Sequence, residues 1–445
     1  MNVLVYGLGR SGLASVRLLR RQGHQVEFME SREAGPDISE AQLLGARRLT
    51  DVSQTTASVA IAAPGVPIDH ADLLQLAKNG VEITGEVEWV SRTFPNRLVG
   101  VTGTAGKGTV TAWITHVLNG AGTKALAGGN IDPALSEVAD QSSVLVAELS
   151  SFQLERSTGL DPQVAVALNL GEDHLDRHRT VAAYHAAKHN LLNRLSAAHL
   201  FVYNADDEVL ESWKAERDGR SAGFSLSAPA DAWLDGDRLI LHGRELLRAA
   251  ELPLSGDHNI ANALATALAC AELGLDHDAI ASGLRSFSGL PGRFSTVGSF
   301  MGITFIEDSI ATRPLAVHAA LRASSKPIVW IGGGQNKGAD IREFRTVAAE
   351  RVALFIGIGS SGGEFCDGLR DVVPVLHCPE ADGRLAMRRA LRAAGQHLHG
   401  HSARGGTVLL APLAASFDQF SDYRERARVF REEVLLLEES WTPSS

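Results

Sequence analysis

Short hydrophobic runs of the kind that form β-strands recur along the chain. They lie at residues 3–6, 26–29, 59–62, 98–102, 144–147, 164–168, 200–203, 328–331, 354–358 and 408–410. Most are separated by segments in which apolar residues recur at helical spacing, such as Leu13, Val16 and Leu19. Continuous apolar strands that alternate with helices are typical of parallel sheets covered on both faces. The pattern therefore predicts an α/β protein built on parallel sheets.

Residues 221–258 interrupt this alternation. Short alternating runs there surround the turn signals Asp235-Gly236 and His242-Gly243, which predicts a small antiparallel insertion. Residues 260–273 are apolar almost without a break, which predicts a buried helix. Turn-forming residues near 91–96 and 289–292 indicate two boundaries. We therefore expect three α/β domains, at residues 1–91, 92–291 and 292–445.

The composition is that of an ordinary globular protein. Hydrophobic residues make up 44% of the 445 residues and charged residues 21%, which excludes a disordered chain, a coiled coil and a disulfide scaffold. Lys and Arg number 42 against 52 Asp and Glu, so the net charge is −10 and a broad nucleic-acid-binding face is not expected. Any anionic ligand must be bound by local donors.

The cysteines and the first residues of the chain indicate the cellular compartment in which the protein is expected. Cys270, Cys366 and Cys378 are scattered without the spacing of a zinc site or a disulfide framework. The first residues lack the features of a signal peptide, and no run of about 18 apolar residues occurs. We therefore expect a cytoplasmic protein that neither enters a membrane nor binds nucleic acid.

A glycine-rich turn follows the first predicted strand. Gly7-Leu8-Gly9-Arg10-Ser11-Gly12 opens a predicted helix, and Glu30 ends the next strand, as in dinucleotide-binding folds. Backbone N–H groups at a helix N-terminus can bind any pyrophosphate, including that of a nucleotide sugar. The alternative is a tight turn without a ligand.

A second glycine-rich loop has the context of a phosphate-binding P-loop, between a predicted strand and a helix that begins near Val110. The loop consists of Gly103, Thr104, Ala105, Gly106, Lys107, Gly108 and Thr109. Its amides would surround phosphates, and Lys107 would reach the β- and γ-phosphates of a nucleotide. Gly108 stands where a P-loop has a Ser or Thr that binds Mg²⁺. A plain glycine-rich turn is the alternative.

Polar residues follow the next two strands. Glu148 ends a strand near the P-loop, where a carboxylate can hold Mg²⁺. Asp173 and His174 lie in the loop after the following strand, and they suit a second metal, although such a cluster is more often a solvated turn. Lys188 lies on the next predicted helix, where a solvated lysine is the ordinary expectation.

Together these residues resemble the Mur ligase family of ATP-dependent amide ligases, over the whole chain. Besides the P-loop, the resemblance includes the segment from Glu148 to Gln153, residues 169–176, the helix with Lys188, and residues 258–263, 289–294, 308–309, 332–338 and 414–420. Within the family it is most similar to the ligases that add D-glutamate to UDP-N-acetylmuramoyl-L-alanine. The signs of that branch are the first glycine-rich turn and residues 63–65, 128–130, 150–155 and 416–420.

The resemblance implies a Rossmann-like N-terminal domain, a central P-loop ATPase-like domain and a Rossmann-like C-terminal domain. The implied enzyme uses ATP and Mg²⁺ to join D-glutamate to UDP-N-acetylmuramoyl-L-alanine through an acyl phosphate. That reaction belongs to cytoplasmic peptidoglycan synthesis, and so to cell-wall formation, cell shape and cell division. We expect a monomer.

The resemblance also implies roles for individual residues. The catalytic residues would be Lys107, His174 and Lys188, and Mg²⁺ would be held by Glu148, His174 and a carbamylated Lys188. Beyond the P-loop, ATP would contact Asn259, Asn262, Arg293 and Asp308. The UDP-sugar would contact Arg10, Ser11, Ser31, Arg32, Pro64, Gly65 and Asn130, and D-glutamate would contact Thr312, Lys337, Ser416, Phe417 and Tyr423.

Three positions depart from the family pattern. Gly108 lacks the P-loop hydroxyl, Ile310 replaces a basic residue while Arg313 adds one, and Glu30 stands where Asp is more frequent. The first two departures motivate a second hypothesis, a catalytically weakened protein that binds nucleotide or UDP-sugar. A third hypothesis is a nicotinamide oxidoreductase built on the first glycine-rich turn, which would leave the P-loop unexplained.

Overall fold

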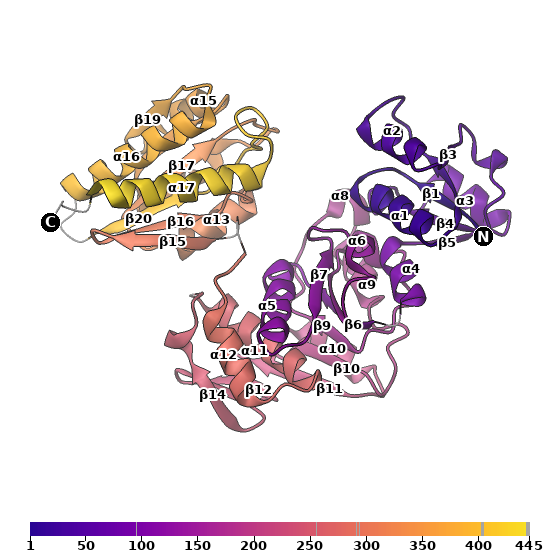
Figure 1. Cartoon of the computed structure of the whole chain (residues 1–445). Helices are drawn as coiled ribbons and strands as arrows, with labels where there is room; N and C mark the ends of the chain where they lie inside the picture. Colours follow the sequence, from indigo (N-terminus) through magenta and orange to yellow (C-terminus); the bar gives the residue numbers. More distant parts are fainter. Residues whose placement is uncertain (95, 255, 291, 293, 402–404, 442–445) are drawn as a thin grey trace. The chain divides into compact units, whose positions relative to one another are not determined.

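The computed structural model describes residues 1–94, 96–254, 256–290, 292, 294–401 and 405–441. These residues form three β-sheets with helices between the strands, which confirms the predicted α/β class (Figure 1). The chain divides into two compact units, Met1–Phe287 and Ser288–Ser445. The first unit contains two of the sheets, and the second unit contains the third.

The first sheet has five parallel strands in the order β3-β2-β1-β4-β5. Its strands are β1 (Asn2–Tyr6), β2 (Gln25–Met29), β3 (Arg47–Arg48), β4 (Val59–Ala62) and β5 (Glu82–Thr84), with helices α1 (Arg10–Arg21), α2 (Pro36–Leu43), α3 (Ala71–Lys78) and α4 (Glu86–Thr93). The strand order reverses between β1 and β4. In such sheets ligands bind at the carboxyl ends of the strands beside this reversal.

The second sheet has nine strands in the order β14-β13-β12-β11-β10-β9-β6-β8-β7. They are β6 (Arg97–Thr102), β7 (Ala125–Gly129), β8 (Val144–Glu148), β9 (Val164–Ala167), β10 (Leu200–Asn204), β11 (Ser221–Ser225), β12 (Ala232–Asp235), β13 (Arg238–Leu241) and β14 (Arg244–Arg248). The pairs β12–β13 and β13–β14 are antiparallel, whereas β11 pairs in parallel with both β10 and β12. The predicted insertion is therefore the edge of this sheet. Both turn signals lie at its antiparallel connections, but the expected antiparallel start at residue 221 is wrong, because β11 pairs in parallel with both of its neighbours.

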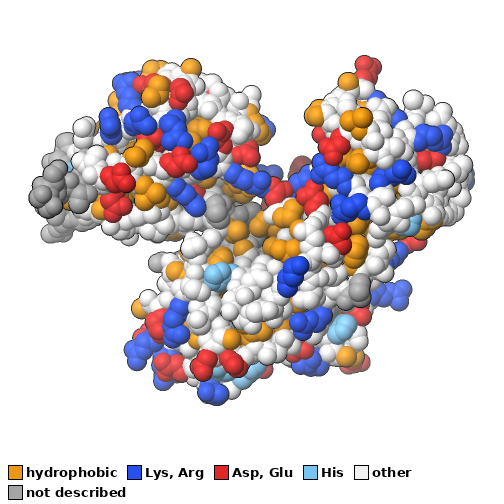
Figure 2. All heavy atoms as spheres, viewed as in Figure 1, with side chains coloured by type: hydrophobic (Ala, Val, Ile, Leu, Met, Phe, Trp, Pro, Cys, Tyr) orange, Lys and Arg blue, Asp and Glu red, His pale blue; other side chains and the backbone are white. Residues whose placement is uncertain are grey.

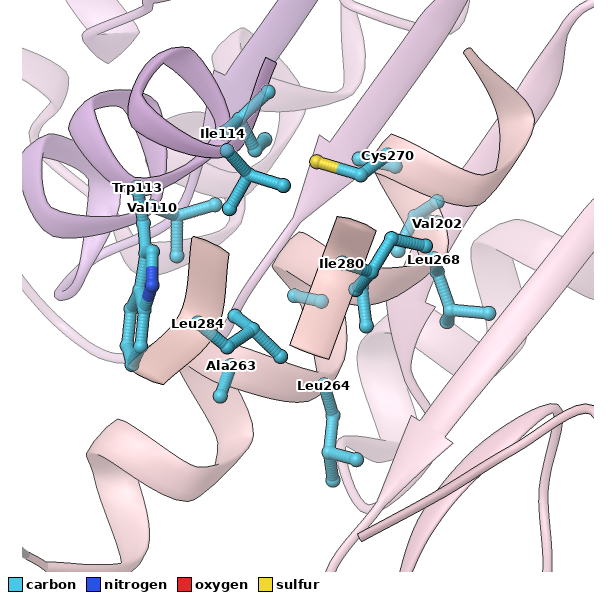
Figure 3. Packing of buried hydrophobic residues seen from close by; sticks show 14 of the residues in the cluster. Val110, Trp113, Ile114, Val202, Ala263, Leu264, Leu268, Cys270, Ile280 and Leu284 are labelled. Carbon is cyan, nitrogen blue, oxygen red and sulfur yellow. The ribbon is translucent and has the colours of Figure 1, made fainter. Parts of the chain in front are cut away.

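Three helices cover one face of the second sheet and enclose a hydrophobic core (Figure 3). They are α5 (Lys107–Gly120), α11 (Asp257–Glu272) and α12 (His277–Ser286). Trp113 of α5 stacks on Phe287 just after α12, with ring centroids 4.9 Å apart. Helix α11 buries most of its residues, which confirms the buried helix predicted from its apolar run. Its N-terminal part lies beside the P-loop, where Asn262 approaches Gly106.

Alternate residues of the central strands face two different cores. Val99 of β6 belongs to the core under α5 and α11, whereas Leu98 belongs to a second core on the other face of the sheet. That second core also contains Val5 of the first sheet and Trp89 of α4. The first two sheets are therefore joined by one continuous hydrophobic core. Shorter helices complete this unit: α6 (Leu135–Val138), α7 (Ser151–Leu154), α8 (Leu175–His178), α9 (Val181–His189) and α10 (Glu208–Ala215).

The third sheet has six strands in the order β15-β16-β20-β17-β18-β19, of which β15 and β16 pair antiparallel. They are β15 (Ser295–Phe300), β16 (Ile303–Glu307), β17 (Ile328–Gly333), β18 (Val352–Ile358), β19 (Val375–Cys378) and β20 (Gly406–Leu410). Helices α16 (Gly383–His401) and α17 (Tyr423–Trp441) pack on one face. Helices α13 (Pro314–Ala323), α14 (Arg345–Arg351) and α15 (Gly362–Leu369) pack on the other.

Every hydrophobic run predicted as a strand is a strand, and the helix predicted from Leu13, Val16 and Leu19 is α1. The three cysteines are free and buried, as their scattered spacing indicates. Across the described residues, no helix combines the length and the apolar character needed to cross a membrane.

Candidate active site

The P-loop connects β6 to α5 in the predicted strand–loop–helix context. Gly103 has φ 151° and Gly106 has φ 82°, backbone conformations that favour glycine. A Cβ at Gly106 would lie 2.6 Å from the side-chain oxygen of Asn262, on the second turn of α11. Asn262 in turn donates to Asn259 at 3.3 Å. The structure therefore places Asn262 against the P-loop, with Asn259 bonded to it. Gly108 is buried and Thr109 half-buried on α5.

Two lysines converge on one carbonyl of the P-loop. Lys107 donates to the Gly103 oxygen at 2.8 Å and to the Thr104 oxygen at 3.0 Å. Lys188 of α9 donates to the same Gly103 oxygen at 2.8 Å, and its side chain is almost completely buried. Burial and then the charge of Lys107 lower the pKa of Lys188 to about 7, against the opposite effect of Asp173 and Glu148. Lys188 is therefore not the solvated lysine that is ordinarily expected on such a helix.

A loop after β9 pairs with the tip of the P-loop. The Asn169 carbonyl accepts from the Thr104 amide at 2.9 Å. The Asn169 side chain accepts from the Ala105 amide at 2.8 Å and donates to the Ala105 carbonyl at 3.2 Å. The Gly171 amide donates to the Thr104 hydroxyl at 2.9 Å. These bonds tie the P-loop to the segment that leads to His174.

His174 lies at the start of α8 in a left-handed conformation, with φ 53°. Its ring centroid is 4.8 Å from that of Phe152 and 6.2 Å from that of Tyr184, and its Nε2 lies 3.5 Å from a carboxylate oxygen of Asp173. Tyr184 also packs under the Lys188 ammonium, 4.7 Å from its ring centroid, and donates to Thr104. The aromatic ring of Tyr184 therefore connects His174 with Lys188.

Glu148 ends β8, next to β6, and is buried. Its Oε1 accepts from the Asn130 side chain at 2.6 Å, whereas its Oε2 has no hydrogen-bond partner among the described residues. A buried carboxylate oxygen without a partner suits a cation. In the described part of the chain, no three His, Cys, Asp or Glu residues form a metal cluster. Mg²⁺ commonly takes one or two carboxylates and completes its shell with water and phosphate oxygens, so the residues present fit it.

The carboxyl ends of β1, β2 and β4 line a cavity of about 950 Å³, at the strand reversal. Six of the seven residues predicted for the UDP-sugar line it: Arg10, Ser11, Ser31, Pro64, Gly65 and Asn130. Arg10 bonds to the Asn130 carbonyl at 2.7 Å and forms an ion pair with Asp132, and Ser11 donates to the buried Glu86. The cavity is therefore bounded by residues of both the first and the second sheet.

Arg32, the seventh predicted residue, is not among the lining residues. It donates to Glu30 at 3.2 Å and to Asp37 at 3.0 Å. Glu30 also accepts from the Leu8 amide at 2.9 Å, within the first glycine-rich turn. Burial alone would raise the pKa of Glu30, but the hydrogen bonds from Arg32 and Leu8 lower this pKa to about 2. Glu30 is therefore ionised, and its carboxylate already accepts hydrogen bonds from this turn and from Arg32.

The residues predicted for D-glutamate all lie in the second compact unit. Lys337 lies over the ring of the exposed Phe417, 5.5 Å from its centroid, and Ser416 beside it is buried. Tyr423 begins α17, and its carbonyl accepts from Ser309 at 2.8 Å. The unit therefore brings the 416–417 segment close to Lys337. Thr312, at the end of the loop after β16, and Asp308, directly after β16, belong to this unit as well, and Arg293 lies outside the described residues.

Comparison with known proteins decides the family. Residues 101–270 match the Mur ligase middle domain, and residues 1–85 match the MurD-like N-terminal domain of Mur ligases. A UDP-N-acetylmuramoylalanine–D-glutamate ligase of Thermus thermophilus is 43% identical over 446 residues, covering 99% of either chain. The chain belongs to the Mur ligase family. The ligase of the same name from Deinococcus radiodurans is 42% identical over 98% of this chain and 92% of its own.

Solved Mur ligases share the fold at low sequence identity. MurF of Acinetobacter baumannii has a TM-score of 0.63 at 16% identity, covering 93% of this chain and 92% of its own. MurC of Thermotoga maritima has a TM-score of 0.57 at 19% identity, covering 99% of this chain and 100% of its own. These similarities show a Mur ligase fold over nearly the whole chain.

Two residues at the P-loop and the cavity were not predicted as site residues. Asn169 holds the P-loop through its side-chain amide, and Gln153 lines the cavity of the first sheet while it caps α7 with Ser150. Both follow the carboxyl end of a strand, at β9 and β8, which was the available signal. Asn169 bonds to Ala105, 64 positions away, and Gln153 lines a cavity formed mostly by residues of the first sheet, so the sequence pattern did not identify them.

Proposed function

We propose that this chain ligates D-glutamate to UDP-N-acetylmuramoyl-L-alanine, with conversion of ATP to ADP and phosphate, in peptidoglycan precursor synthesis. The supporting observation is the convergence of Lys107 and Lys188 on Gly103 beside the unpartnered Glu148 oxygen. This site lies in a chain whose full length matches D-glutamate ligases at 43% identity. Because ATP and these substrates are small intracellular molecules, we place the reaction in the cytoplasm. We also propose that the chain acts as a monomer.

The reaction needs two transfers. The substrate carboxylate attacks the γ-phosphorus of ATP, the bond to ADP breaks, and an acyl phosphate forms. The amine of D-glutamate then attacks the acyl carbon, phosphate leaves, and the amine gives up a proton. Both reactants of the first step are anionic, so positive charge must be placed between them. Lys107, at the start of α5, would leave its loop carbonyls to pair with the transferring phosphoryl group.

Glu148, His174 and a carbamylated Lys188 are proposed to hold Mg²⁺. Bound Mg²⁺ would neutralise the phosphate and acyl oxygens. The neutral Lys188 amine can attack carbon dioxide to form an N–C bond and lose a proton, which leaves an anionic carbamate with the hard oxygen donors that Mg²⁺ prefers. A lysine with a pKa of about 7 has a substantial neutral fraction at physiological pH. The unpaired Glu148 Oε2 offers the second oxygen donor.

The remaining residues are proposed to orient the substrates. The cavity at the first sheet, with Arg10, Ser11 and Asn130, would take the UDP-sugar, since its glycine-rich turn and the first turn of α1 present amides to a diphosphate. In the second unit, Lys337 would pair with a carboxylate of D-glutamate between Thr312, Ser416, Phe417 and Tyr423. Asn259, Asn262, Arg293 and Asp308 would contact ATP.

Phosphate release tests this proposal. The purified protein is given ATP, Mg²⁺ and UDP-N-acetylmuramoyl-L-alanine, with D-glutamate, L-glutamate, D-aspartate, L-lysine or no amino acid. We expect phosphate release only in the reaction that contains D-glutamate. No release from a folded protein that still binds the UDP-sugar would favour the weakened binding protein motivated by Gly108. Binding of NADH without phosphate release would favour an oxidoreductase.

A further inference from the structure

Two arginines of the second sheet bind one short segment of the first. Arg156, just after α7, donates to the Val66 carbonyl at 2.5 Å. Arg177 of α8 donates to the same carbonyl at 2.9 Å and to the Gly65 carbonyl at 3.4 Å. Residues 64–66 line the cavity assigned to the UDP-sugar. The two guanidinium groups therefore fix one wall of that cavity from behind.

The two arginines differ in how their charges are balanced. Arg177 forms an ion pair with Glu155 at 2.7 Å. Arg156 is 7% exposed, and its Nε and Nη1 have no hydrogen-bond partner in the described part of the chain. Burial and then the charge of Arg177 lower the pKa of Arg156 to about 10, against the opposite effect of Glu155, so Arg156 keeps its charge near neutral pH. A buried cation with a single hydrogen bond costs stability, so its packing alone gives no reason for it.

The segment that Arg156 binds connects two parts of the reaction site. Val66 packs its side chain toward the first glycine-rich turn, 3.4 Å from where a Cβ of Gly7 would lie. On the other side, Arg156 follows the helix with Gln153, which lines the same cavity, and Arg177 lies three residues after His174. A shift of residues 64–66 would therefore change the distance between the cavity and His174.

We infer that Arg156 is a positioning residue for the UDP-sugar. Through the Val66 carbonyl it fixes the cavity wall relative to the loop that leads to His174. The inference rests on the proposed assignment of this cavity. Arg156 touches no reacting atom; it fixes the wall against which the substrate lies. Loss of Arg156 would therefore weaken binding of the UDP-sugar while leaving the ATP site intact. Arg177 is a poorer probe, because its removal would also break its ion pair with Glu155.

The test compares Arg156→Met and Arg156→Lys with Arg179→Met. Arg179 is a matched control: its side chain is 82% exposed, and it pairs with Asp69 at 3.4 Å, close to the same segment. For Arg156→Met we expect a roughly tenfold rise in KM for the UDP-sugar, with KM for ATP changed less than about twofold. Its melting temperature should not fall, because the variant removes unpartnered buried N–H groups. Arg156→Lys, which can still donate to Val66, should recover most of the affinity.

Calorimetric titration of UDP-N-acetylmuramoyl-L-alanine measures the same effect without turnover. If the wild-type protein releases no phosphate, the proposed function fails, but the loss of affinity in Arg156→Met still tests the inference. Wild-type affinity in Arg156→Met would overturn it. A lower melting temperature with equal changes in both KM values would also overturn it, because that result indicates a role in packing alone.

Discussion

Lys107 and Lys188 donate hydrogen bonds to the same oxygen, that of Gly103, each at 2.8 Å. Two ammonium groups on one carbonyl repel each other, and the buried partner loses its proton more easily. Burial and the charge of Lys107 accordingly lower the pKa of Lys188 from 10.5 to about 7. The P-loop lysine therefore favours the neutral amine that the proposed carbamylation requires.

Replacing Lys107 by alanine should abolish turnover. The charge on the transferring phosphoryl group would no longer be compensated, and we expect phosphate release to fall by about three orders of magnitude. Lys124→Ala is the control, because Lys124 is an exposed lysine of the same unit. Near-normal turnover in Lys107→Ala would contradict the P-loop assignment.

Activity should rise with pH when dissolved carbon dioxide is limiting. Because the pKa of Lys188 is about 7, its neutral fraction rises roughly tenfold between pH 6 and pH 8. Initial rates at fixed low carbon dioxide measure this rise, and saturating carbon dioxide should reduce it. In the unfolded chain Lys188 keeps its proton up to about pH 10.5, so its contribution to the free energy of unfolding also rises with pH from about 7 to 10.5. Rates independent of carbon dioxide at every pH would argue against carbamylation.

Lys188→Ala should be inactive and partly rescued by short carboxylic acids. The substitution removes the proposed oxygen ligand and leaves a space that acetate or formate can enter. Phosphate release is measured with increasing acid, and the same series on Lys107→Ala is the control. Rescue confined to Lys188→Ala is expected; equal responses of the two variants would count against a ligand role.

Gly106→Ala should weaken ATP binding far more than Gly122→Ala. Both glycines have nearly the same backbone conformation, with φ 82° and 84°. The new Cβ would lie 2.6 Å from Asn262 at position 106 but would meet nothing within 4 Å at position 122. Both variants should lose about 1 kcal/mol of stability from the strained backbone. Titration with ATP separates the loss of stability from the clash at Asn262. Equal ATP affinities of the two variants would show that the Asn262 side chain can move away from the new Cβ with no loss of binding.

Gly108→Ser tests whether the missing P-loop hydroxyl limits the enzyme. A serine there supplies the oxygen that a P-loop normally offers to Mg²⁺, so KM for ATP should fall severalfold. Gly120→Ser on the same helix is the control, because a Cβ there would meet nothing within 4 Å. An unchanged or higher KM in Gly108→Ser would mean that this chain does not need the hydroxyl.

The strands and the P-loop could be predicted because their signals are local. The run at residues 98–102 and the glycines after it define β6 and the loop before α5 without reference to the rest of the chain. Strand β7 was missed because its Ala-Leu-Ala-Gly-Gly sequence has little strand character, and its pairing with β8 is what makes it a strand. Strand β16 was missed as well. It is mostly buried in the fold, where it pairs with β20.

Features of the site that depend on contacts distant in sequence could not be predicted. The low pKa of Lys188 needs Lys107 nearby, 81 positions earlier in the numbering, and no spacing rule connects them. The bond between Arg156 and Val66 likewise joins residues 90 positions apart. The family resemblance located Lys188 as a site residue, but its burial and its contact with Gly103 come from the fold.

The core shared by the first two sheets determines which fragments of this chain can exist alone. Helix α4 contributes Trp89 and Val90 to a core that also contains Leu145 of the second sheet. A polypeptide cut after residue 91 would expose these side chains to water and would tend to aggregate. A polypeptide ending at Phe287 keeps all of them covered. Heating should therefore melt the first two sheets together, as a single cooperative transition.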